Sequence, residues 1–298
     1  MKKSILYMVL FGILLSALLC SCNAVKVNKT GPLTWELKDG TLTISGQGPM
    51  PNYLDNSRPS VSGGPWCNLV GGSRDNISSI IINEGVTNIG NNAFVRNCDN
   101  VLSVSIPGSV TNIGENAFAG CKSITTIIIP DGVINIDNFA FQGCSKLISI
   151  DIPDSVIRIG GYAFNGCNGL LTVSLGKNVK YIGIDAFMEC SNILTVTSSN
   201  PIPPYMETRD GPILSATQNS ALQDRFSAFD SVTNKCRLIV PDEFIVAYKE
   251  DTEWNKFFNN RASPVKAGQV QFRSGTKTEG GGIIWSDDLF TNTKNGNE

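Results

Sequence analysis

The chain has 298 residues, of which 41% are hydrophobic and 17% charged, and its formal net charge is -2. This composition is typical of a globular chain, and the slightly negative charge without a long basic run argues against a nucleic-acid partner. The sequence contains no histidine, which excludes Ser-His-Asp and Cys-His catalysis, HExxH zinc sites and histidine-based pH switches.

Residues 1–21 are predicted to be a bacterial lipoprotein signal peptide. Lys2 and Lys3 precede the apolar run Ile5–Leu19, which has signal-peptide length and is shorter than the roughly 20 residues of a membrane-spanning helix. The run ends in Leu-Cys-Ser-Cys at residues 19–22, which resembles a lipobox with Cys22 as the modified residue. An ordinary secretory signal with incidental cysteines is the alternative interpretation.

The lipobox resemblance implies cleavage after Ser21 and acylation of Cys22. Several acyl chains together anchor a protein firmly, so the predicted membrane contact is a lipid anchor at Cys22. The expected location is the cell envelope, as an outer-membrane lipoprotein. Surface exposure is left open, because no acidic run follows Cys22.

Residues 77–192 consist of five consecutive repeats of 24, 23, 23, 23 and 23 residues. A constant short period predicts a solenoid, in which each unit buries its apolar face by stacking on the next. The repeats are Ile77–Asn100, Val101–Ser123, Ile124–Lys146, Leu147–Gly169 and Leu170–Asn192.

Each repeat holds two groups of alternating apolar residues, which predict two short strands. In the second repeat, Val104 and Ile106 mark the first strand, and Val110 and Ile113 mark the second. Pro107 ends the first strand, where a missing backbone donor is tolerated. A glycine follows the second strand in four repeats, where we expect it to permit a tight backbone bend. These glycines are Gly90, Gly114, Gly160 and Gly183.

One phenylalanine and one cysteine also recur at constant positions. The phenylalanines predict an aromatic ladder that fills the core; they are Phe94, Phe118, Phe141, Phe164 and Phe187. The cysteines predict a column of buried free thiols, because in-register rungs point their Cβ atoms in parallel and so disfavour disulfides. Disulfides between neighbouring rungs are the alternative. These cysteines are Cys98, Cys121, Cys144, Cys167 and Cys190.

The combined pattern L-x-x-I-x-I-P-x-x-V-x-x-I-G-x-x-A-F-x-x-C resembles the BspA-type leucine-rich repeat of bacterial surface proteins. The match covers all five repeats, with Asp137 in place of the glycine and Leu175-Gly176 in place of Ile-Pro. The resemblance implies a mainly β fold with short helical or 3-10 turns, built as a leucine-rich-repeat solenoid. It also implies an N-terminal β-hairpin cap, matched by Leu33–Leu37 and Gly40–Pro51, and a C-terminal capping repeat. In that capping repeat a strand at Leu238–Pro241 precedes a short helix.

The flanking regions complete the predicted organisation. Residues 22–76 are interpreted as an anchor linker followed by the β cap. Residues 193–262 are interpreted as a degenerate sixth repeat with an inserted loop at Ser198–Thr233, followed by the capping repeat. Residues 263–298 are expected to form a flexible or loosely packed tail, in which Ile283–Trp285 hints at one further strand.

The family resemblance implies attachment to host proteins, other bacteria or glycans, and it identifies no individual ligand. Outward-facing residues of the second strands form the candidate binding face. Tyrosine and arginine are enriched at binding hot spots, so the C-terminal half of this face is the part expected to bind a partner. The alternative is a solvated strand face without a partner. The candidate residues are Asn112, Asn135, Arg158, Lys180 and Tyr181.

We expect no enzymatic activity. The sequence has no G-x-S-x-G elbow, Walker loop, dinucleotide-binding glycine pattern or EF-hand series. The acidic pairs at 250–251 and 287–288 would need a surrounding pocket to be catalytic, and such pairs are usually surface charge. We therefore predict neither a cofactor nor a metal site.

A third class of function is a glycan-binding or structural accessory of an outer-membrane system. Tryptophans in caps and loops either seal the ends of a solenoid core or present platforms on which sugars stack. Exposure discriminates between these roles, because a buried indole offers no platform. The four tryptophans all lie outside the five repeats; they are Trp35, Trp66, Trp254 and Trp285.

Overall fold

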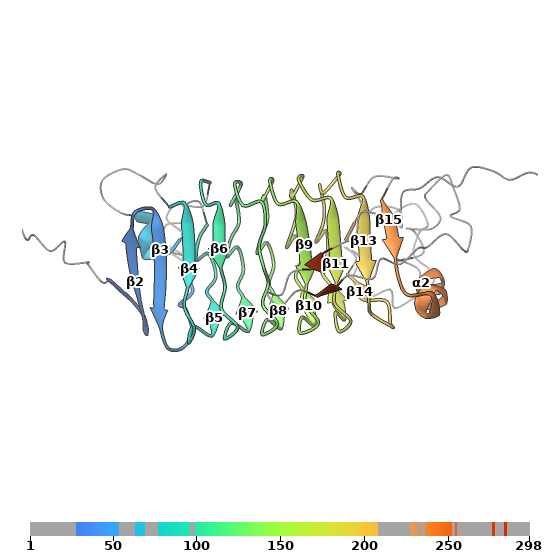
Figure 1. Ribbon diagram of the computed structural model, residues 1–298, viewed down its shortest axis with the longest axis horizontal. Coiled ribbons are helices and arrows are strands. Elements are labelled where there is room, and N and C mark those ends of the chain that lie inside the picture. The colour runs from blue at the N-terminus through green and yellow to red at the C-terminus, as the bar shows by residue number, and fades with distance from the viewer. Residues whose placement is uncertain are drawn as a thin grey trace, which may run out of the picture.

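The structure is a computed structural model, and it shows one elongated stack of rungs whose strands run across the long axis (Figure 1). It describes residues 28–53, 63–68, 77–95, 99–207, 228–229, 232, 236–251, 254, 276–277 and 283–284. The predicted signal peptide, Cys22, most of the inserted loop and most of the tail lie outside the described residues. Within the described part of the chain, none of the helices has the length and apolar character needed to cross a bilayer.

An antiparallel hairpin closes the N-terminal end of the stack. Strand β2 (Leu33–Lys38) pairs with β3 (Thr41–Gly46) across the turn at Asp39 and Gly40, and β1 (Asn28–Thr30) pairs with the other edge of β2. Both turn residues have positive φ, 49° and 76°, as expected for a two-residue hairpin turn with the right-handed twist of the strands. Strand β3 then pairs in parallel with β4 (Ser79–Ile82), the first strand of the first repeat.

The first strands of the rungs form one face of the stack, and we call this face the first sheet. They pair in parallel from β3 onward, with apolar residues pointing inward at every second position. This face consists of two hydrogen-bonded segments, β1-β2-β3-β4-β6 and β9-β11-β13-β15. The further strands are β6 (Ser103–Ser105), β9 (Ser149–Ile152), β11 (Thr172–Leu175), β13 (Thr195–Ser198) and β15 (Arg237–Ile239).

The gap between these segments corrects one expectation. The third repeat was predicted to form a first strand, yet residues 124–129 form no ladder with either neighbour. A backbone hydrogen bond from the Ile148 N–H to the Thr125 carbonyl, at 3.0 Å, links this stretch to the next rung. Ile127 and Ile129 are nevertheless 7% and 5% exposed. Burial of these side chains, rather than a β ladder, therefore keeps the third rung in the stack.

The second strands form a six-stranded parallel sheet on the other side of the core, which we call the second sheet. Each strand has two residues, of which the first faces outward and the second is buried. The order is β14-β12-β10-β8-β7-β5. The strands are β5 (Asn88–Ile89), β7 (Asn112–Ile113), β8 (Asn135–Ile136), β10 (Arg158–Ile159), β12 (Tyr181–Ile182) and β14 (Tyr205–Met206).

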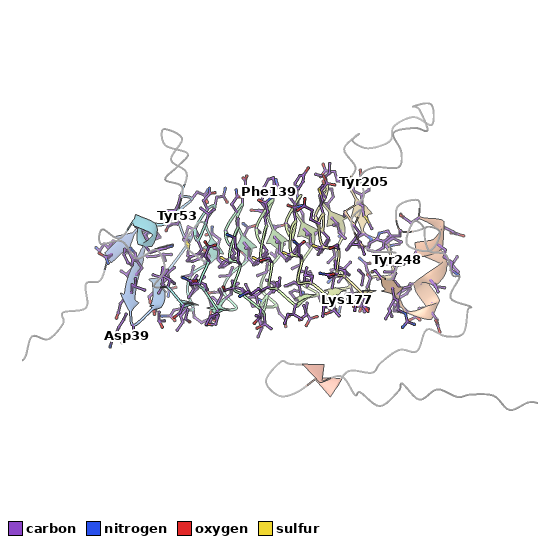
Figure 2. The ribbon with its side chains drawn as sticks, turned by 90° about the horizontal axis from the view of Figure 1, so that it is seen from above. Asp39, Tyr53, Phe139, Lys177, Tyr205 and Tyr248 are labelled. Carbon is purple, nitrogen blue, oxygen red and sulfur yellow. The ribbon has the colours of Figure 1, made fainter. Side chains whose placement is uncertain are left out.

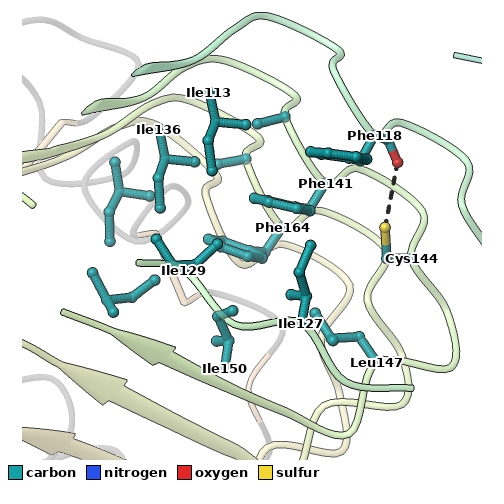
Figure 3. Close-up of a cluster of buried hydrophobic side chains, with 14 of the residues drawn as sticks. Ile113, Phe118, Ile127, Ile129, Ile136, Phe141, Cys144, Leu147, Ile150 and Phe164 are labelled. Atoms are coloured by element: carbon teal, nitrogen blue, oxygen red, sulfur yellow. Dashed lines mark hydrogen bonds between the residues drawn. The ribbon is translucent and has the colours of Figure 1, made fainter. Parts of the chain in front are cut away.

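A continuous aromatic column runs through the core between the two sheets (Figure 3). Neighbouring ring centroids lie 4.6 to 6.0 Å apart, and the phenylalanine rings are stacked nearly parallel. This confirms the predicted ladder and extends it by a tryptophan at each end. The column consists of Trp66, Phe94, Phe118, Phe141, Phe164, Phe187, Phe229 and Trp254.

The predicted thiol column lies beside the aromatic column. Cys121, Cys144, Cys167 and Cys190 are buried and form no disulfide bond, which confirms the prediction for these four; Cys98 lies outside the described residues. Each of the last three thiols donates a hydrogen bond to the carbonyl of the phenylalanine one rung earlier, at 3.4, 3.2 and 3.1 Å. Figure 3 shows the first of them, from Cys144 to Phe118. The cysteine therefore fills space and also satisfies a buried backbone acceptor.

The repeat glycines are explained by the close approach of neighbouring rungs. Gly114 does not have a positive φ, so the left-handed backbone does not explain it. A Cβ atom at Gly114 would lie 2.7 Å from the Ile89 carbonyl oxygen, and one at Gly160 would lie 2.5 Å from the Asn138 nitrogen. The close approach of the preceding rung therefore requires glycine at these positions.

The C-terminal end is closed by a strand followed by a short helix, as predicted. Strand β15 leads through the 3-10 turn η4 (Asp242–Phe244) into α2 (Ile245–Glu250). Viewed from above, Tyr248 lies at this end of the stack and Tyr53 at the other (Figure 2). Further along the chain, β16 (Thr276–Lys277) pairs antiparallel with β17 (Ile283–Ile284), which confirms the strand that the apolar triplet suggested.

Candidate binding surface

Four of the predicted site residues form one column on the second sheet. Asn112, Asn135, Arg158 and Tyr181 are paired in register across β7, β8, β10 and β12. Each begins its strand, and the next residue of each strand is fully buried, so the column faces outward. Lys180 directly precedes β12 and is exposed. The fifth predicted site residue therefore lies beside the same column.

The sequence analysis missed Tyr205, which extends the column by one rung. It pairs in register with Tyr181 and is 47% exposed. It lies within Ser198–Thr233, the stretch interpreted from the sequence as an inserted loop, but its spacing of 24 residues from Tyr181 is the signal that identifies it. We refer to Arg158, Lys180, Tyr181 and Tyr205 as the arginine–tyrosine patch.

Aromatic contacts hold the arginine–tyrosine patch together. The Cζ atom of Arg158 lies 4.8 Å from the centroid of the Tyr181 ring, within the range of a cation–π interaction. The ring of Tyr181 lies 5.8 Å from that of Tyr205, with the planes tilted by 31°. The three side chains therefore form one continuous surface across β10, β12 and β14.

Tyr181 is also held at its hydroxyl group. Burial raises the pKa of this phenol, and the hydrogen bond to Glu207 and the charge of that carboxylate raise it further, while the charge of Arg158 lowers it. The phenol therefore stays protonated at neutral pH and donates to Glu207. The same carboxylate accepts a hydrogen bond from the Ile184 N–H at 3.4 Å. These contacts restrict the orientation of the Tyr181 ring.

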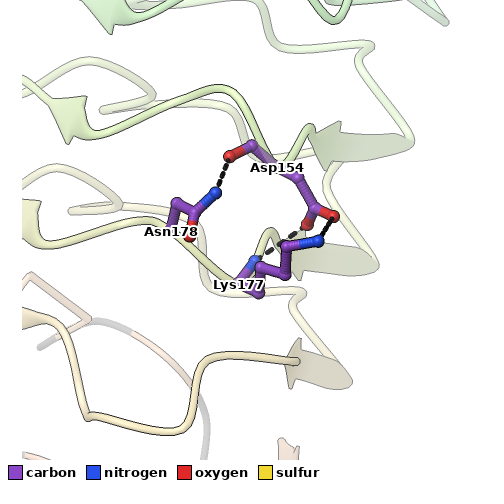
Figure 4. A network of polar contacts seen from close by, with 3 residues as sticks. All are labelled: Asp154, Lys177 and Asn178. Carbon is purple, nitrogen blue, oxygen red and sulfur yellow. Dashed lines mark hydrogen bonds and ion pairs between the residues drawn. The ribbon is translucent and has the colours of Figure 1, made fainter.

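The two cations of the patch differ from Lys122 and Lys177, which form ion pairs. Lys177 pairs with Asp154 at 3.0 Å across the preceding turn, where Asn178 also donates to the Asp154 carbonyl at 2.8 Å (Figure 4). Within the described residues, neither Arg158 nor Lys180 takes part in an ion pair. Their charges are therefore available to a partner.

Exposed aliphatic side chains border the patch. Ile157, which precedes Arg158, and Ile134, one rung earlier, are each 41% exposed. A combination of tyrosine, arginine and exposed aliphatic area is typical of the anchoring part of a protein interface. The chemistry of the patch thus suits a macromolecular partner.

The N-terminal half of the predicted face has a structural role. The Asn112 side-chain amide donates to the Asp137 carboxylate at 2.9 Å in a partly buried position. Thr111, which precedes it, hydrogen-bonds to the Thr87 carbonyl one rung earlier at 3.1 Å. These side chains tie neighbouring rungs together, so the candidate surface narrows to the C-terminal half.

A second aromatic pair lies on the adjoining edge of the stack. Phe139 and Tyr162 stack at 5.0 Å with nearly parallel rings, and both have left-handed backbones, with φ of 59° and 56°. Other rungs place Asn92, Asn116 and Asp185 here, residue types that tolerate positive φ far better than bulky aromatics do. Figure 2 shows Phe139 on the same long edge of the stack as Tyr205.

An open groove runs along the turns at Gly120, Gly143 and Gly166, with Asn165 and Glu189 among its lining residues. It is too open to exclude water from a reacting group. Among the residues that the structure describes, no three His, Cys, Asp or Glu side chains come together as a potential metal site. The groove therefore offers polar surface without an evident catalytic arrangement.

Three of the four tryptophans are buried. Trp35, Trp66 and Trp254 are 5%, 2% and 0% exposed, and the last two end the aromatic column. These positions therefore seal the core and provide no platform for sugars. Trp285 lies outside the described residues.

The repeat region matches a known family. The family described as BspA type leucine rich repeat region matches residues 73–194, in six copies. Similar solved structures include a leucine-rich repeat protein from Eubacterium ventriosum, with 28% identity and a TM-score of 0.48, over 59% of this chain and 43% of that one. The chain thus spans less than half of that protein.

Two further solved structures are similar. The leucine rich repeat protein of T. pallidum is 26% identical with a TM-score of 0.41, over 58% of this chain and 71% of that one. A leucine rich cell surface protein from Faecalibacterium prausnitzii is 25% identical with a TM-score of 0.38, over 62% of this chain and 59% of that one. No curated protein matches the chain.

Proposed function

Because residues 73–194 belong to the BspA-type leucine-rich-repeat family, we propose that the chain is a non-catalytic cell-envelope lipoprotein that binds a protein partner through the arginine–tyrosine patch. The lipid on Cys22 would hold it in the outer membrane, and the partner would be a protein of a host or of another bacterium. The partner class follows from the family resemblance together with the chemistry of the patch.

One observation carries the proposal. Arg158, Tyr181 and Tyr205 lie side by side on an exposed sheet face. The unpaired cations would steer an acidic partner surface toward the patch, and the rings would supply most of the buried area. Ile134 and Ile157 would extend the apolar contact.

The solenoid makes the patch rigid before binding. The residues inside β10, β12 and β14 are at most 2% exposed, and the backbone of each strand is hydrogen-bonded to the next rung. A side chain on such a support loses little conformational entropy when a partner binds. This preorganisation allows even a small patch to bind a partner with useful affinity.

The competing role as a glycan-binding or structural accessory has less support. Its argument depended on tryptophan platforms, and the three described indoles are buried. We therefore do not propose glycan binding, and the experiment below includes a treatment that would detect it.

Attachment to host cells tests the patch directly. Cells that display the wild-type protein would be compared with cells that display the Arg158→Ser/Tyr181→Ser/Tyr205→Ser variant. The matched control is Thr87→Ser on the same sheet, three rungs before Arg158. Loss of attachment in the triple variant alone, at equal surface amounts, supports the proposal. Unchanged attachment, or attachment abolished by glycosidase treatment of the host cells, contradicts it.

Anchoring and orientation need a separate test. A Cys22→Ala variant should leave the membrane fraction while the wild type remains in it. Protease treatment of intact cells should remove the repeats while a periplasmic control protein survives. If the repeats survive until the envelope is broken, the protein faces the periplasm and the role in attachment is wrong.

A further inference from the structure

The outer surface of the first sheet has an unusual composition, independent of the patch on the second sheet. Strands β3, β4, β6, β9, β11 and β13 lie side by side across the stack (Figure 1). At one outward position, β3 and each of the six rungs after it carry a hydroxyl side chain. These residues are Thr41, Ser79, Ser103, Thr126, Ser149, Thr172 and Thr195.

The register shows that these hydroxyls form one row. Thr41 is paired with Ser79, and Ser79 with Ser103, while Thr172 is paired with both Ser149 and Thr195. The Ser103 hydroxyl donates to the Ser79 hydroxyl at 3.0 Å. All seven side chains are partly or fully exposed. Thr126 holds the same repeat position in the rung where the ladder is interrupted.

An aliphatic row runs directly beside the hydroxyl row. Leu102, Ile148, Leu171 and Leu194 each precede a hydroxyl residue and are 63%, 48%, 40% and 48% exposed. On the other side of the hydroxyl row, Ile128 is 80% exposed. We call the surface formed by these rows, from β3 to β13, the hydroxyl face.

The hydroxyl face is almost free of charge. Across β3 and the six rungs that follow, Asp151 is the one ionisable side chain among the outward positions of these rows. Charged residues flank the face at its ends, with Glu36 and Lys38 on β2 and Arg237 on β15. An uncharged centre with a charged margin is the distribution found in protein interfaces. Exposed sheet faces that must stay free usually carry more charge.

We propose that the hydroxyl face is an interface between two copies of this chain. A hydroxyl group both donates and accepts hydrogen bonds, so a row of hydroxyls is complementary to an identical row, whereas a row of like charges would repel its copy. A second copy also repeats at the same spacing of about 4.8 Å per rung, so contacts made at one rung recur at the next. The aliphatic rows add apolar area that both copies remove from water.

The size of the face sets the expected strength of association. Seven strands about 4.8 Å apart and four residues of about 3.3 Å each give a projected area of about 400 Å². A standard stable interface buries about 800 Å² per partner. The dimer should therefore be weak, with a dissociation constant in the micromolar range or above. Tethering both copies to one membrane would raise their effective concentration.

A second copy fits this face better than a polysaccharide does. The described rows contain no aromatic ring on which a sugar could stack and no side-chain amide to bind sugar hydroxyls. The arrangement also leaves the second sheet open on each copy, because the two sheets lie on opposite sides of the core. A dimer would thus present two arginine–tyrosine patches and bind a multivalent partner with avidity.

Sedimentation of the purified full chain in density-matched detergent tests the proposal, over concentrations from about 1 μM to about 1 mM. The wild type should shift from monomer to dimer over this range. Thr172→Lys places a charge in the hydroxyl row and should weaken the dimer at least about tenfold. Thr87→Lys makes the same substitution on the second sheet and should leave the dimer unchanged. Equal urea midpoints for the two variants would show that both remain folded.

Each other result overturns the proposal. A wild-type chain that stays monomeric throughout has no such interface. A dimer that survives Thr172→Lys, or that Thr87→Lys weakens equally, is formed by another surface. If the wild type is monomeric and Thr172→Lys abolishes retention on a neutral insoluble polysaccharide, the face recognises glycans instead. Because sedimentation requires no external partner, its outcome is independent of the attachment test for the patch.

Discussion

The guanidinium of Arg158 lies over the ring of Tyr181, with 4.8 Å between the Cζ atom and the ring centroid. These residues are 23 positions apart in the sequence, and the parallel register of β10 and β12 brings them together. The contact joins a cation to an aromatic surface on an open sheet face. Substitutions at this contact can therefore change binding without a large change in stability, whereas substitutions in the core would change both.

Replacing Arg158 by glutamine should affect binding far more than folding. The side chain is exposed, so we expect the free energy of unfolding to fall by no more than about 1 kcal/mol. Attachment should drop clearly, because the cation and its stacking are lost together. Urea denaturation and the cell-attachment assay measure the two effects. A large loss of stability with normal attachment would assign Arg158 a structural role.

Truncation of the aromatic column should be costly. Phe141 is 1% exposed and lies between Phe118 and Phe164, at 5.4 and 5.2 Å. Phe141→Ala removes a ring from the centre of the column, and we expect a loss of about 3–5 kcal/mol in urea denaturation. Phe141→Leu should lose less, because it keeps more of the volume. A loss below about 1 kcal/mol for the alanine variant would mean that the column contributes little.

Two glycines should respond to alanine for different reasons. Gly114 lacks space, since a Cβ would lie 2.7 Å from the Ile89 carbonyl oxygen, whereas Gly120 has open space but a φ of +80°. Gly120→Ala should cost about 1–2 kcal/mol of backbone strain. Gly114→Ala should cost more, because a neighbouring rung must move. Thermal unfolding of both variants shows which one loses more stability. A larger loss for Gly120→Ala than for Gly114→Ala would refute the role of close approach.

The buried thiols should be unreactive in the folded protein. Burial, together with the neighbouring Cys144 and Cys190, raises the pKa of the Cys167 thiol well above its usual range, and the nucleophilic thiolate is therefore scarce at neutral pH. Iodoacetamide should leave Cys144, Cys167 and Cys190 unmodified in buffer and label them in urea, as read by mass spectrometry. Rapid labelling of Cys167 in buffer would show that the rungs open locally.

Alkaline pH should destabilise the C-terminal cap through Tyr248. Burial raises the pKa of this phenol to about 12, the charge of Asp251 contributes, and the hydrogen bond with Ser198 opposes the shift. The unfolded chain loses this proton near pH 10, so the stabilisation is complete below pH 10 and is lost as pH rises toward 12.

The matched variant for this prediction is Tyr248→Phe. It removes the hydroxyl that hydrogen-bonds Ser198 at 2.7 Å and the Asn200 carbonyl at 3.1 Å, so we expect a loss of about 1–3 kcal/mol at neutral pH. It should also reduce the fall in stability between pH 10 and 12. Urea midpoints of both proteins across this range test the assignment, which fails if their pH dependence is identical.

Much of the interior was predictable because the period is local and strict. Phe118, Phe141 and Phe164 recur every 23 residues, and such spacing leaves few ways to bury each ring other than beside the next. Tyr205 and the stacked pair of Phe139 and Tyr162 were not predicted. Tyr205 belongs to an interrupted repeat, and the left-handed positions of the pair carry asparagine in other rungs.

The sequence by itself determined the stacked repeats, the inward-facing columns and the free thiols, because each rung must bury the same apolar residues against its neighbours. The repeat also predicted one outward face for Asn112, Asn135, Arg158 and Tyr181, and the tertiary structure decided which of these side chains are in contact. It joined Arg158, Tyr181 and Tyr205 into one surface, and it gathered the hydroxyl side chains on the opposite sheet. Outward positions are not constrained by burial, so their neighbours depend on the register between rungs, and that register exists only after the rungs have stacked.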